Sequence, residues 1–255
     1  MPFPNFDYAI IGSGNVAHFL AFKLMEKGLK VKQIYSRNPS TGKDLADLTN
    51  ASFESTIQTI NAQVIFIAVQ DDQIQAVASQ LPSSSLLLYT SGSVNLSKLP
   101  QQNCGVFYPL QTFSKTNYKE SFNGPILLET HDVKMREFCI NLCDTLNLSY
   151  KFTSSDERKN IHLCAVFLNN FINHIASLGH KEATERAIDY SLFKPLIDKT
   201  FNNIQTNDPN LQQSGPARRN DKNIINEHLS MLKGDSKTIY HQITESILLK
   251  YGHKL

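Results

Sequence analysis

The chain has little of what marks a secreted, membrane-bound or nucleic-acid-binding protein. Its formal net charge is only +2 over 255 residues, and it has no basic stripe or acidic tail, which argues against nucleic acid or an anionic membrane as a partner. The N-terminus lacks the positive and apolar segments of a signal peptide. No apolar run approaches the length of a membrane span. We therefore expect a cytoplasmic protein with no membrane partner.

Cysteine is also scarce, and the four cysteines form no paired framework. Cys139 and Cys143 are four residues apart, a spacing that could place two thiolates on one helix face. The same stripe carries Met135, Phe138, Leu142 and Leu146. Because free cysteine behaves as a small buried hydrophobe, we interpret this stripe as core and expect no metal site.

Strands and helices alternate over the first 150 residues or so. Strands are expected at 7–11, 31–36, 63–69, 85–90, 106–108 and 126–129, and helices at 15–27, 39–48 and about 72–80. This alternation predicts an α/β domain with a doubly wound, mostly parallel sheet of the Rossmann type. The remainder reads as helices at 156–178, 181–205, 221–233 and 236–250. We therefore place a Rossmann domain at 1–153 and an all-α C-terminal domain at 154–255.

A glycine-rich loop joins the first predicted strand to the first predicted helix. Its sequence, from Gly12 to Ala17, matches GxGxxA. In this pattern the first glycine permits a tight turn and the second lets a pyrophosphate approach the backbone, while the small last residue allows the helix to pack on the strand. The helix N-terminus then offers free N–H groups to the anion. We expect a dinucleotide to be bound by Gly12, Ser13, Gly14, Asn15 and Val16; the alternative is a glycine turn without a nucleotide.

The end of the second strand predicts which dinucleotide binds. An NAD-binding domain usually carries Asp or Glu here to hold the ribose hydroxyls, whereas this strand ends Tyr35-Ser36-Arg37-Asn38. Ser36 and Asn38 can hydrogen-bond a 2′-phosphate, and Arg37 can pair with it. The sequence therefore favours NADP, with a merely solvent-exposed arginine as the alternative.

Two further loops follow predicted strands at the carboxyl edge of the sheet, where ligands bind in open α/β folds. Val69 lies in one and Ser91 in the other, and we expect both to line the nicotinamide side of the cleft. For Asp72, in the first loop, a helix N-cap is the preferred interpretation.

Six motifs occur in order along the chain: IIGSGNVA, FIAVQDDQI, YTSGSV, FYPLQTFSK, HLCAVFLNNFINH and SGPARRND. Together they resemble the Rossmann-like NADP oxidoreductases that have an uncharacterised helical C-terminal domain. The resemblance extends from Tyr8 to about Leu249. More distantly, the layout is similar to pyrroline-carboxylate reductase, prephenate dehydrogenase and the β-hydroxyacid dehydrogenases. The resemblance implies a helical domain that closes over the cofactor and a homodimer built from the C-terminal helices, but it supplies no substrate.

The FYPLQTFSK motif is similar in position to the His-Pro segment of prephenate dehydrogenase. Tyr108 stands where that family has histidine, so a histidine acid/base is excluded at this position. Gln111 and Thr112 are candidates for hydrogen bonding to a substrate. The alternative is a structural turn fixed by Pro109.

The predicted helix from 156 carries polar residues on an otherwise apolar face. His162 lies four residues after Arg158, and Asn169 and Asn173 continue the same face. Such a line costs burial energy unless it is partnered, which makes it a candidate cleft wall. Imidazole gains and loses a proton near neutral pH, so we expect His162 to be the acid/base and the asparagines to orient the substrate. The alternative is that these are satisfied polar groups between helices or subunits.

The similarity to β-hydroxyacid dehydrogenases would place a lysine, and an asparagine one turn later, on this helix. Lys159 fits the first position, but Leu163 occupies the second. A catalytic lysine is therefore not carried over.

The SGPARRND loop places two adjacent arginines before a helix. Arg218 is a candidate for holding a carboxylate or phosphate of the substrate. The alternative is a solvated loop in which Asp221 caps the following helix.

These residues predict an NADP-dependent oxidoreductase that transfers a hydride to or from a small carbonyl, hydroxyl or imine substrate. A non-catalytic NADP(H)-binding sensor or assembly protein is the alternative, because fold does not fix function. A reductase that couples NADP to F420 or a flavin also stays open.

Overall fold

The computed structural model describes residues 6–99, 101, 103–114 and 122–253. Residues 1–5 of the N-terminus and Lys115 of the FYPLQTFSK motif lie outside the described residues. Contacts divide the chain into two compact units, Met1–Asn169 and Asn170–Leu255. The sequence-based boundary after residue 153 marks instead the point where strands give way to helices, since the last strand ends at Phe152.

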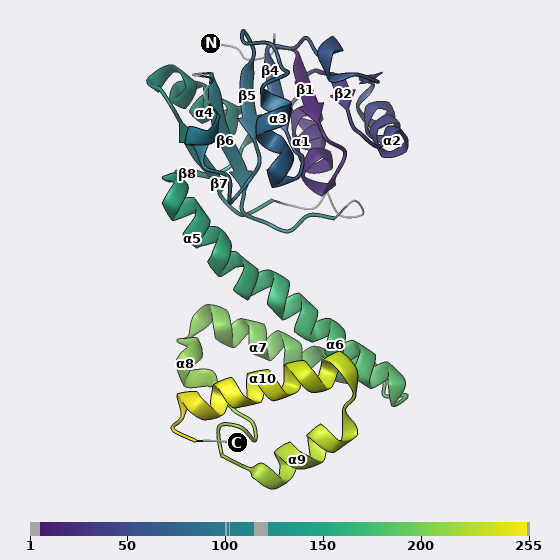
Figure 1. The fold of residues 1–255 in the computed structure, drawn as a ribbon, viewed down its shortest axis with the longest axis vertical. Helices are drawn as coiled ribbons and strands as arrows, with labels where there is room; N and C mark the ends of the chain where they lie inside the picture. The colour runs from purple at the N-terminus through teal and green to yellow at the C-terminus, as the bar shows by residue number, and fades with distance from the viewer. Residues whose placement is uncertain (1–5, 100, 102, 115–121, 254–255) are drawn as a thin grey trace. The chain divides into compact units, whose positions relative to one another are not determined.

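The first unit is built on one sheet of eight strands, in the order β3-β2-β1-β4-β5-β6-β7-β8 (Figure 1). Among the strands that the structure describes, only the β6–β7 pair is antiparallel, so the α/β Rossmann prediction is confirmed. β1 pairs with both β2 and β4, which places the reversal of strand order beside it. The strands are β1 (Tyr8–Ile11), β2 (Val31–Tyr35), β3 (Ser52–Glu54), β4 (Val64–Ile67), β5 (Leu86–Tyr89), β6 (Cys104–Pro109), β7 (Ile126–Thr130) and β8 (Tyr150–Phe152).

Helices cover both faces of this sheet. They are α1 (Asn15–Glu26), α2 (Pro39–Thr49), α3 (Ile74–Ala78) and α4 (Val133–Leu146), with short 3-10 turns η2 (Ile57–Thr59), η3 (Asp71–Gln73) and η4 (Leu96–Lys98). The predicted Asp72 cap is wrong, because η3 begins after Gln70 with no side-chain cap. The Asp72 carboxylate instead accepts a hydrogen bond from Gln73 Nε2.

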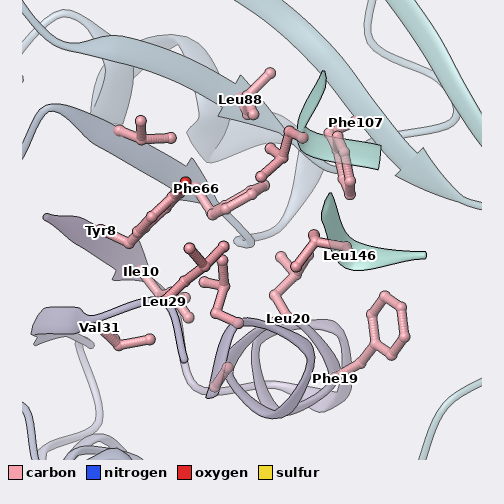
Figure 2. Close-up of a cluster of buried hydrophobic side chains, with 14 of the residues drawn as sticks. Tyr8, Ile10, Phe19, Leu20, Leu29, Val31, Phe66, Leu88, Phe107 and Leu146 are labelled. Carbon is pink, nitrogen blue, oxygen red and sulfur yellow. The ribbon is translucent and has the colours of Figure 1, made fainter. Parts of the chain in front are cut away.

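Two apolar clusters fill the space on either side of the sheet. Alternate side chains of β1 point to opposite faces: Tyr8 and Ile10 belong to one cluster, Ala9 and Ile11 to the other. Figure 2 shows the first cluster, in which strand side chains face Leu20 of α1. Both faces of the central strands are buried, as expected for a parallel sheet.

The cysteine pair of α4 belongs to the first cluster. Cys139 and Cys143 are both fully buried. Burial raises the pKa of Cys139 to about 12 and also raises the pKa of Cys143. Both thiols are therefore held neutral at physiological pH, as suits side chains of the core.

The rest of the chain is helical. The helices are α5 (Ser155–Ala165), the π-helical segment η5 (Val166–Phe171), α6 (Ile172–Glu185), η6 (Tyr190–Phe193), α7 (Lys194–Thr206), α8 (Pro209–Gln212), α9 (Lys222–Met231) and α10 (Gly234–Lys250). The break predicted between 178 and 181 is wrong: α6 continues through Gly179 to Glu185, and the chain turns at Ala187, whose φ is 53°. Asp221 caps α9 by accepting from the N–H of Ile224.

One helical stretch, Ser155–Glu185, is long and apolar enough to cross a membrane by length and composition alone. The expectation that no stretch reaches this length is therefore corrected. The apolar window of this stretch is not buried within the described part of the chain, and the stretch carries Asn169, Asn170 and Asn173 near its centre, which are costly groups within lipid.

Candidate functional site

The glycine loop passes very close to the end of β4. Gly12 has φ +119°, and a Cβ on it would lie 2.1 Å from the carbonyl oxygen of Ala68. Two backbone hydrogen bonds fix this approach, from Gly12 N–H to Tyr35 O (2.7 Å) and from Ala68 N–H to Ile11 O (2.8 Å). Only glycine fits this turn, as the motif predicts.

The start of α1 is open to a ligand. Gly14 is its N-cap, no side chain caps the helix, and its first turn carries no acidic residue. A Cβ on Gly14 would meet nothing within 4 Å. The space that a side chain would fill is therefore free beside unpaired N–H groups at the positive end of a helix, which is the environment that a pyrophosphate requires.

Three hydroxyl groups meet where the glycine loop faces the end of β2. Ser13 Oγ lies 2.8 Å from Ser36 Oγ and 2.6 Å from Thr41 Oγ1. The side chain of Asn38 caps α2: its Oδ1 accepts from the N–H groups of Ser40 and Thr41. The cap uses only Oδ1, whereas a phosphate would accept from Nδ2, so the phosphate-binding role of Asn38 stays a prediction.

Arg37 borders the same region from an exposed position. Its Nη1 donates to Gln73 Oε1 at 3.4 Å, and no ion pair with an acidic side chain is found for it among the described residues. Its positive charge is therefore available to an anionic ligand.

A cleft of about 550 Å³ joins these parts along the carboxyl ends of β1, β2 and β4. The predicted cofactor residues that line it are Gly12, Ser13, Gly14, Ser36, Arg37, Asn38 and Val69. Three other predicted residues do not line it: Asn15, Val16 and Ser91. The amide of Asn15 donates to Phe113 O at 2.7 Å, and Val16 packs against the core.

Ser91 shapes the turn after β5. Its buried hydroxyl accepts from the N–H groups of Ser93 and Val94, each at 3.0 Å. This turn and Tyr108 of β6 lie along the same edge of the sheet as the cleft, because β4, β5 and β6 are parallel neighbours.

The predicted acid/base residue has a partner that the sequence did not reveal. His162 Nδ1 lies 3.1 Å from the hydroxyl of Tyr108, and both residues are partly buried. Burial, together with the negative charge of Asp71, raises the pKa of Tyr108. The tyrosine is therefore a neutral phenol at physiological pH and the histidine is held in one orientation.

A buried ion pair fixes the helix that carries His162. Arg158 is fully buried and pairs with Glu129 of β7, while its second amino group donates to the carbonyl of Val94. Ser155 donates to the same carboxylate and accepts from the N–H of Leu96. Arg158 is thus an anchor between α5, the sheet edge and the turn after β5, rather than part of a cleft wall.

The α-helical spacing from which we predicted one polar face for His162, Asn169 and Asn173 is interrupted between His162 and Asn173. Residues 166–171 are π-helical, and the extra residue per turn changes the phase of the helix. Asn169 donates to Thr112 Oγ1, so the structure joins two of the predicted residues. Asn173 is exposed and belongs to the second unit.

The two remaining predicted substrate residues are both exposed. Gln111 accepts from the N–H of Asn123 at 3.4 Å. Arg218 belongs to the second unit, where it donates to Gln213 O and lies 5.6 Å from the Tyr251 ring centroid. A role in substrate binding stays a prediction for both.

Sequence reasoning missed Thr41, Tyr108 and Gly92 as site residues. Thr41 could have been inferred from the sequence, because it lies in the first turn of the helix that follows the Ser-Arg-Asn segment. For Tyr108, the similarity to prephenate dehydrogenase indicates only the histidine that it replaces, not the residue that it contacts. Gly92 has no local signal, since its role depends on a helix 70 residues later in the chain.

Comparison with known proteins agrees with this geometry. Residues 7–88 match the NADP oxidoreductase, coenzyme F420-dependent, family, and residues 124–247 match a domain of unknown function. The crystal structure of the putative NADP oxidoreductase BF3122 from Bacteroides fragilis is similar over 96% of this chain and 99% of its own, with 30% identity and a TM-score of 0.87. No protein of curated function matches the chain.

More distant structures share the fold. An imine reductase from Myxococcus stipitatus in complex with NADP⁺ has 14% identity and a TM-score of 0.61, with 97% of this chain and 95% of its own covered. A pyrroline-5-carboxylate reductase from Coxiella burnetii has 14% identity and a TM-score of 0.55, with 94% and 97% covered. The chain thus belongs to the Rossmann-like NADP oxidoreductase family whose C-terminal part is the domain of unknown function.

Proposed function

We propose that this protein binds NADP(H) in the cleft beside β1, β2 and β4 and is an NADP-dependent oxidoreductase acting on a small carbonyl, hydroxyl or imine compound. The observation that carries the proposal is the uncapped start of α1, where the position of a Gly14 side chain is empty. The membership of the chain in an NADP oxidoreductase family supports the same conclusion.

The residues at the end of β2 favour NADP over NAD. Arg37 offers a cation, and the Ser13–Ser36–Thr41 cluster offers hydroxyl groups that can turn toward phosphate oxygens. The strand supplies no carboxylate to hold the ribose hydroxyls of NAD, and a carboxylate there would repel a 2′-phosphate. Charge-assisted hydrogen bonds of this kind contribute about 1.5–3 kcal/mol each.

The other groups of the site would handle the substrate. The nicotinamide, when bound, supplies or accepts the hydride. In the reductive direction the imidazolium form of His162 gives its Nε2 proton to the oxygen or nitrogen that gains charge. The electron pair of the N–H bond stays on the ring, which is then neutral with its hydrogen on Nδ1. Asn169, joined to Thr112, would orient the substrate, and we extend that role to Asn173.

A turnover screen tests catalysis. Purified protein with NADPH is offered a panel of aldehydes, ketones, cyclic imines and a deazaflavin, the last because of the name of the matching family. Oxidation of NADPH that depends on one compound, and that falls at least tenfold in His162→Gln, would support the proposal. Tight NADPH binding with no turnover of any compound would instead support the non-catalytic sensor or assembly protein.

We also propose that the protein is a homodimer through its C-terminal helices. Large apolar side chains are exposed on the second unit, among them Leu192 (69%), Leu196 (64%) and Leu211 (73%). Clusters of exposed apolar residues are typical of interaction surfaces. Light scattering should give twice the mass of one chain, and Leu196→Glu should shift the protein toward monomer; a wild-type monomer at all concentrations would contradict the proposal.

A further inference from the structure

The hydrogen bond between Tyr108 and His162 joins two elements distant in the sequence. Tyr108 is the second-last residue of β6, and His162 lies on α5, 54 residues later. The hydroxyl oxygen is 3.1 Å from Nδ1, and the two rings meet edge to face, with centroids 5.9 Å apart and planes at 78°. Nδ1 of the imidazole is therefore occupied by a partner from the same unit.

Gly92 completes the enclosure of this pair. A Cβ on Gly92 would lie 2.9 Å from both Cγ and Nδ1 of His162 and 3.0 Å from Cζ of Tyr108. These distances are shorter than carbon contacts allow, so the turn after β5 can pack its bare backbone on both rings only because residue 92 is glycine. The turn thereby helps to hold the imidazole with its Nδ1 toward the Tyr108 hydroxyl.

The chemistry of the two groups sets the direction of the hydrogen bond. Tyr108 stays a phenol, since burial and the charge of Asp71 raise its pKa. A phenol can donate or accept, but its O–H is a stronger donor than an imidazole N–H, and an imidazole nitrogen is a stronger acceptor than a phenol oxygen. The phenol O–H therefore donates to Nδ1, which leaves the hydrogen of the neutral ring on Nε2. In the imidazolium form both nitrogens carry hydrogens, so Nε2 is a donor in either form.

Nε2 is also available to a ligand within this part of the chain. Among the described residues, no hydrogen bond to Nε2 of His162 is found; the ring is held through Nδ1. A donor at Nε2 matches an atom with a free lone pair, such as a carbonyl oxygen or an imine nitrogen.

We propose that Tyr108 is a positioning residue that holds neutral His162, before any substrate reacts, as the Nε2–H tautomer, and that the ring thereby offers a hydrogen-bond donor to the carbonyl oxygen or imine nitrogen of a substrate. The second part rests on the proposed function. The first part concerns only the two side chains and holds whether or not the protein turns over a substrate.

Nitrogen NMR of the full-length protein, labelled with ¹⁵N-histidine and free of cofactor, tests the first part. The His162 signals are identified by their loss in His162→Gln. At a pH where the ring is neutral, we expect the hydrogen on Nε2 and an Nδ1 resonance shifted to lower frequency by the accepted hydrogen bond. In Tyr108→Phe, which keeps the ring, that resonance should move back to higher frequency.

A second histidine–tyrosine pair provides a matched control. His228 Nδ1 lies 2.8 Å from the hydroxyl of Tyr240, with centroids 5.7 Å apart. Tyr240→Phe should move the Nδ1 resonance of His228 and leave that of His162 unchanged. Gly92→Ala should reproduce the effect of Tyr108→Phe on His162 alone.

Two results would overturn the proposal. One is a neutral His162 that carries its hydrogen on Nδ1, since the tyrosine would then be the acceptor and Nε2 a base. The other is an Nδ1 resonance that is the same in wild type and Tyr108→Phe, because the hydrogen bond would then be absent in solution. Failure of NADPH to bind would contradict the proposed function but leave these signals as expected, so the two failures are distinguishable.

Discussion

Two glycines of one loop should respond to the same substitution in opposite ways. Gly12→Ala should destabilise the protein, whereas Gly14→Ala should leave it folded but unable to hold a dinucleotide tightly. The difference follows from what a methyl group would meet: the carbonyl oxygen of Ala68 at 2.1 Å for Gly12, and nothing within 4 Å for Gly14.

The magnitudes follow from the backbone and the contact. At φ +119° an alanine costs roughly 1–3 kcal/mol in backbone strain, and β4 must also move away from the new methyl group. We expect a total loss of about 3–5 kcal/mol of unfolding free energy, a size reserved for severe local conflicts. Gly14 has φ −81°, so alanine fits there and costs no more than about 1 kcal/mol as a poorer N-cap.

Urea denaturation followed by circular dichroism measures the stabilities, since the chain has no tryptophan. Calorimetric titration with NADPH measures the binding, where we expect Gly14→Ala to weaken affinity at least tenfold, or about 1.4 kcal/mol. Equal stability of the two variants would refute the account of Gly12. Undiminished NADPH affinity in a folded Gly14→Ala would refute the placement of the pyrophosphate at the start of α1.

Other residues give further predictions. Arg158→Met leaves the Glu129 carboxylate without its buried partner and should lower the unfolding free energy of the first unit by about 3–5 kcal/mol; in urea denaturation, the loss in the double variant with Glu129→Gln should be smaller than the sum of the single losses. Burial raises the pKa of Tyr8 from its ordinary 10 to about 12, so the folded protein holds this proton more tightly than the unfolded chain does. The resulting contribution to the unfolding free energy, roughly 3 kcal/mol, is complete below pH 10 and is lost as the pH rises through 12. Tyr8→Phe should remove that part of the alkaline loss of stability, and an unchanged alkaline profile would contradict it.

The fold and the cofactor loop could be predicted from the sequence because their signals are local. The GxGxxA pattern fixes Gly12 at a turn and Gly14 at a helix start, and both lie where expected. Strand positions were predicted well for the apolar runs, but β3 and β8 were missed because each has only three residues.

The substrate side of the site could not be predicted in the same way. The contact between Tyr108 and His162 depends on how α5 docks on the sheet, and that docking depends on Arg158 reaching Glu129. A π-helical segment then alters the phase of the helix before Asn173, which no α-helical periodicity can anticipate. The predicted helix end at residue 178 is wrong because Gly179 lies within α6, which continues to Glu185.

Calorimetric titration of wild type and Arg37→Ala with NADPH and with NADH tests the central claim most directly. The account predicts that wild type binds NADPH more tightly than NADH and that Arg37→Ala loses about tenfold or more in NADPH affinity, with little change for NADH, because one charge-assisted contact to the 2′-phosphate is removed. Equal affinity for the two nucleotides in both proteins would contradict the choice of NADP. Failure of wild type to bind either nucleotide would contradict the assignment of the cleft itself.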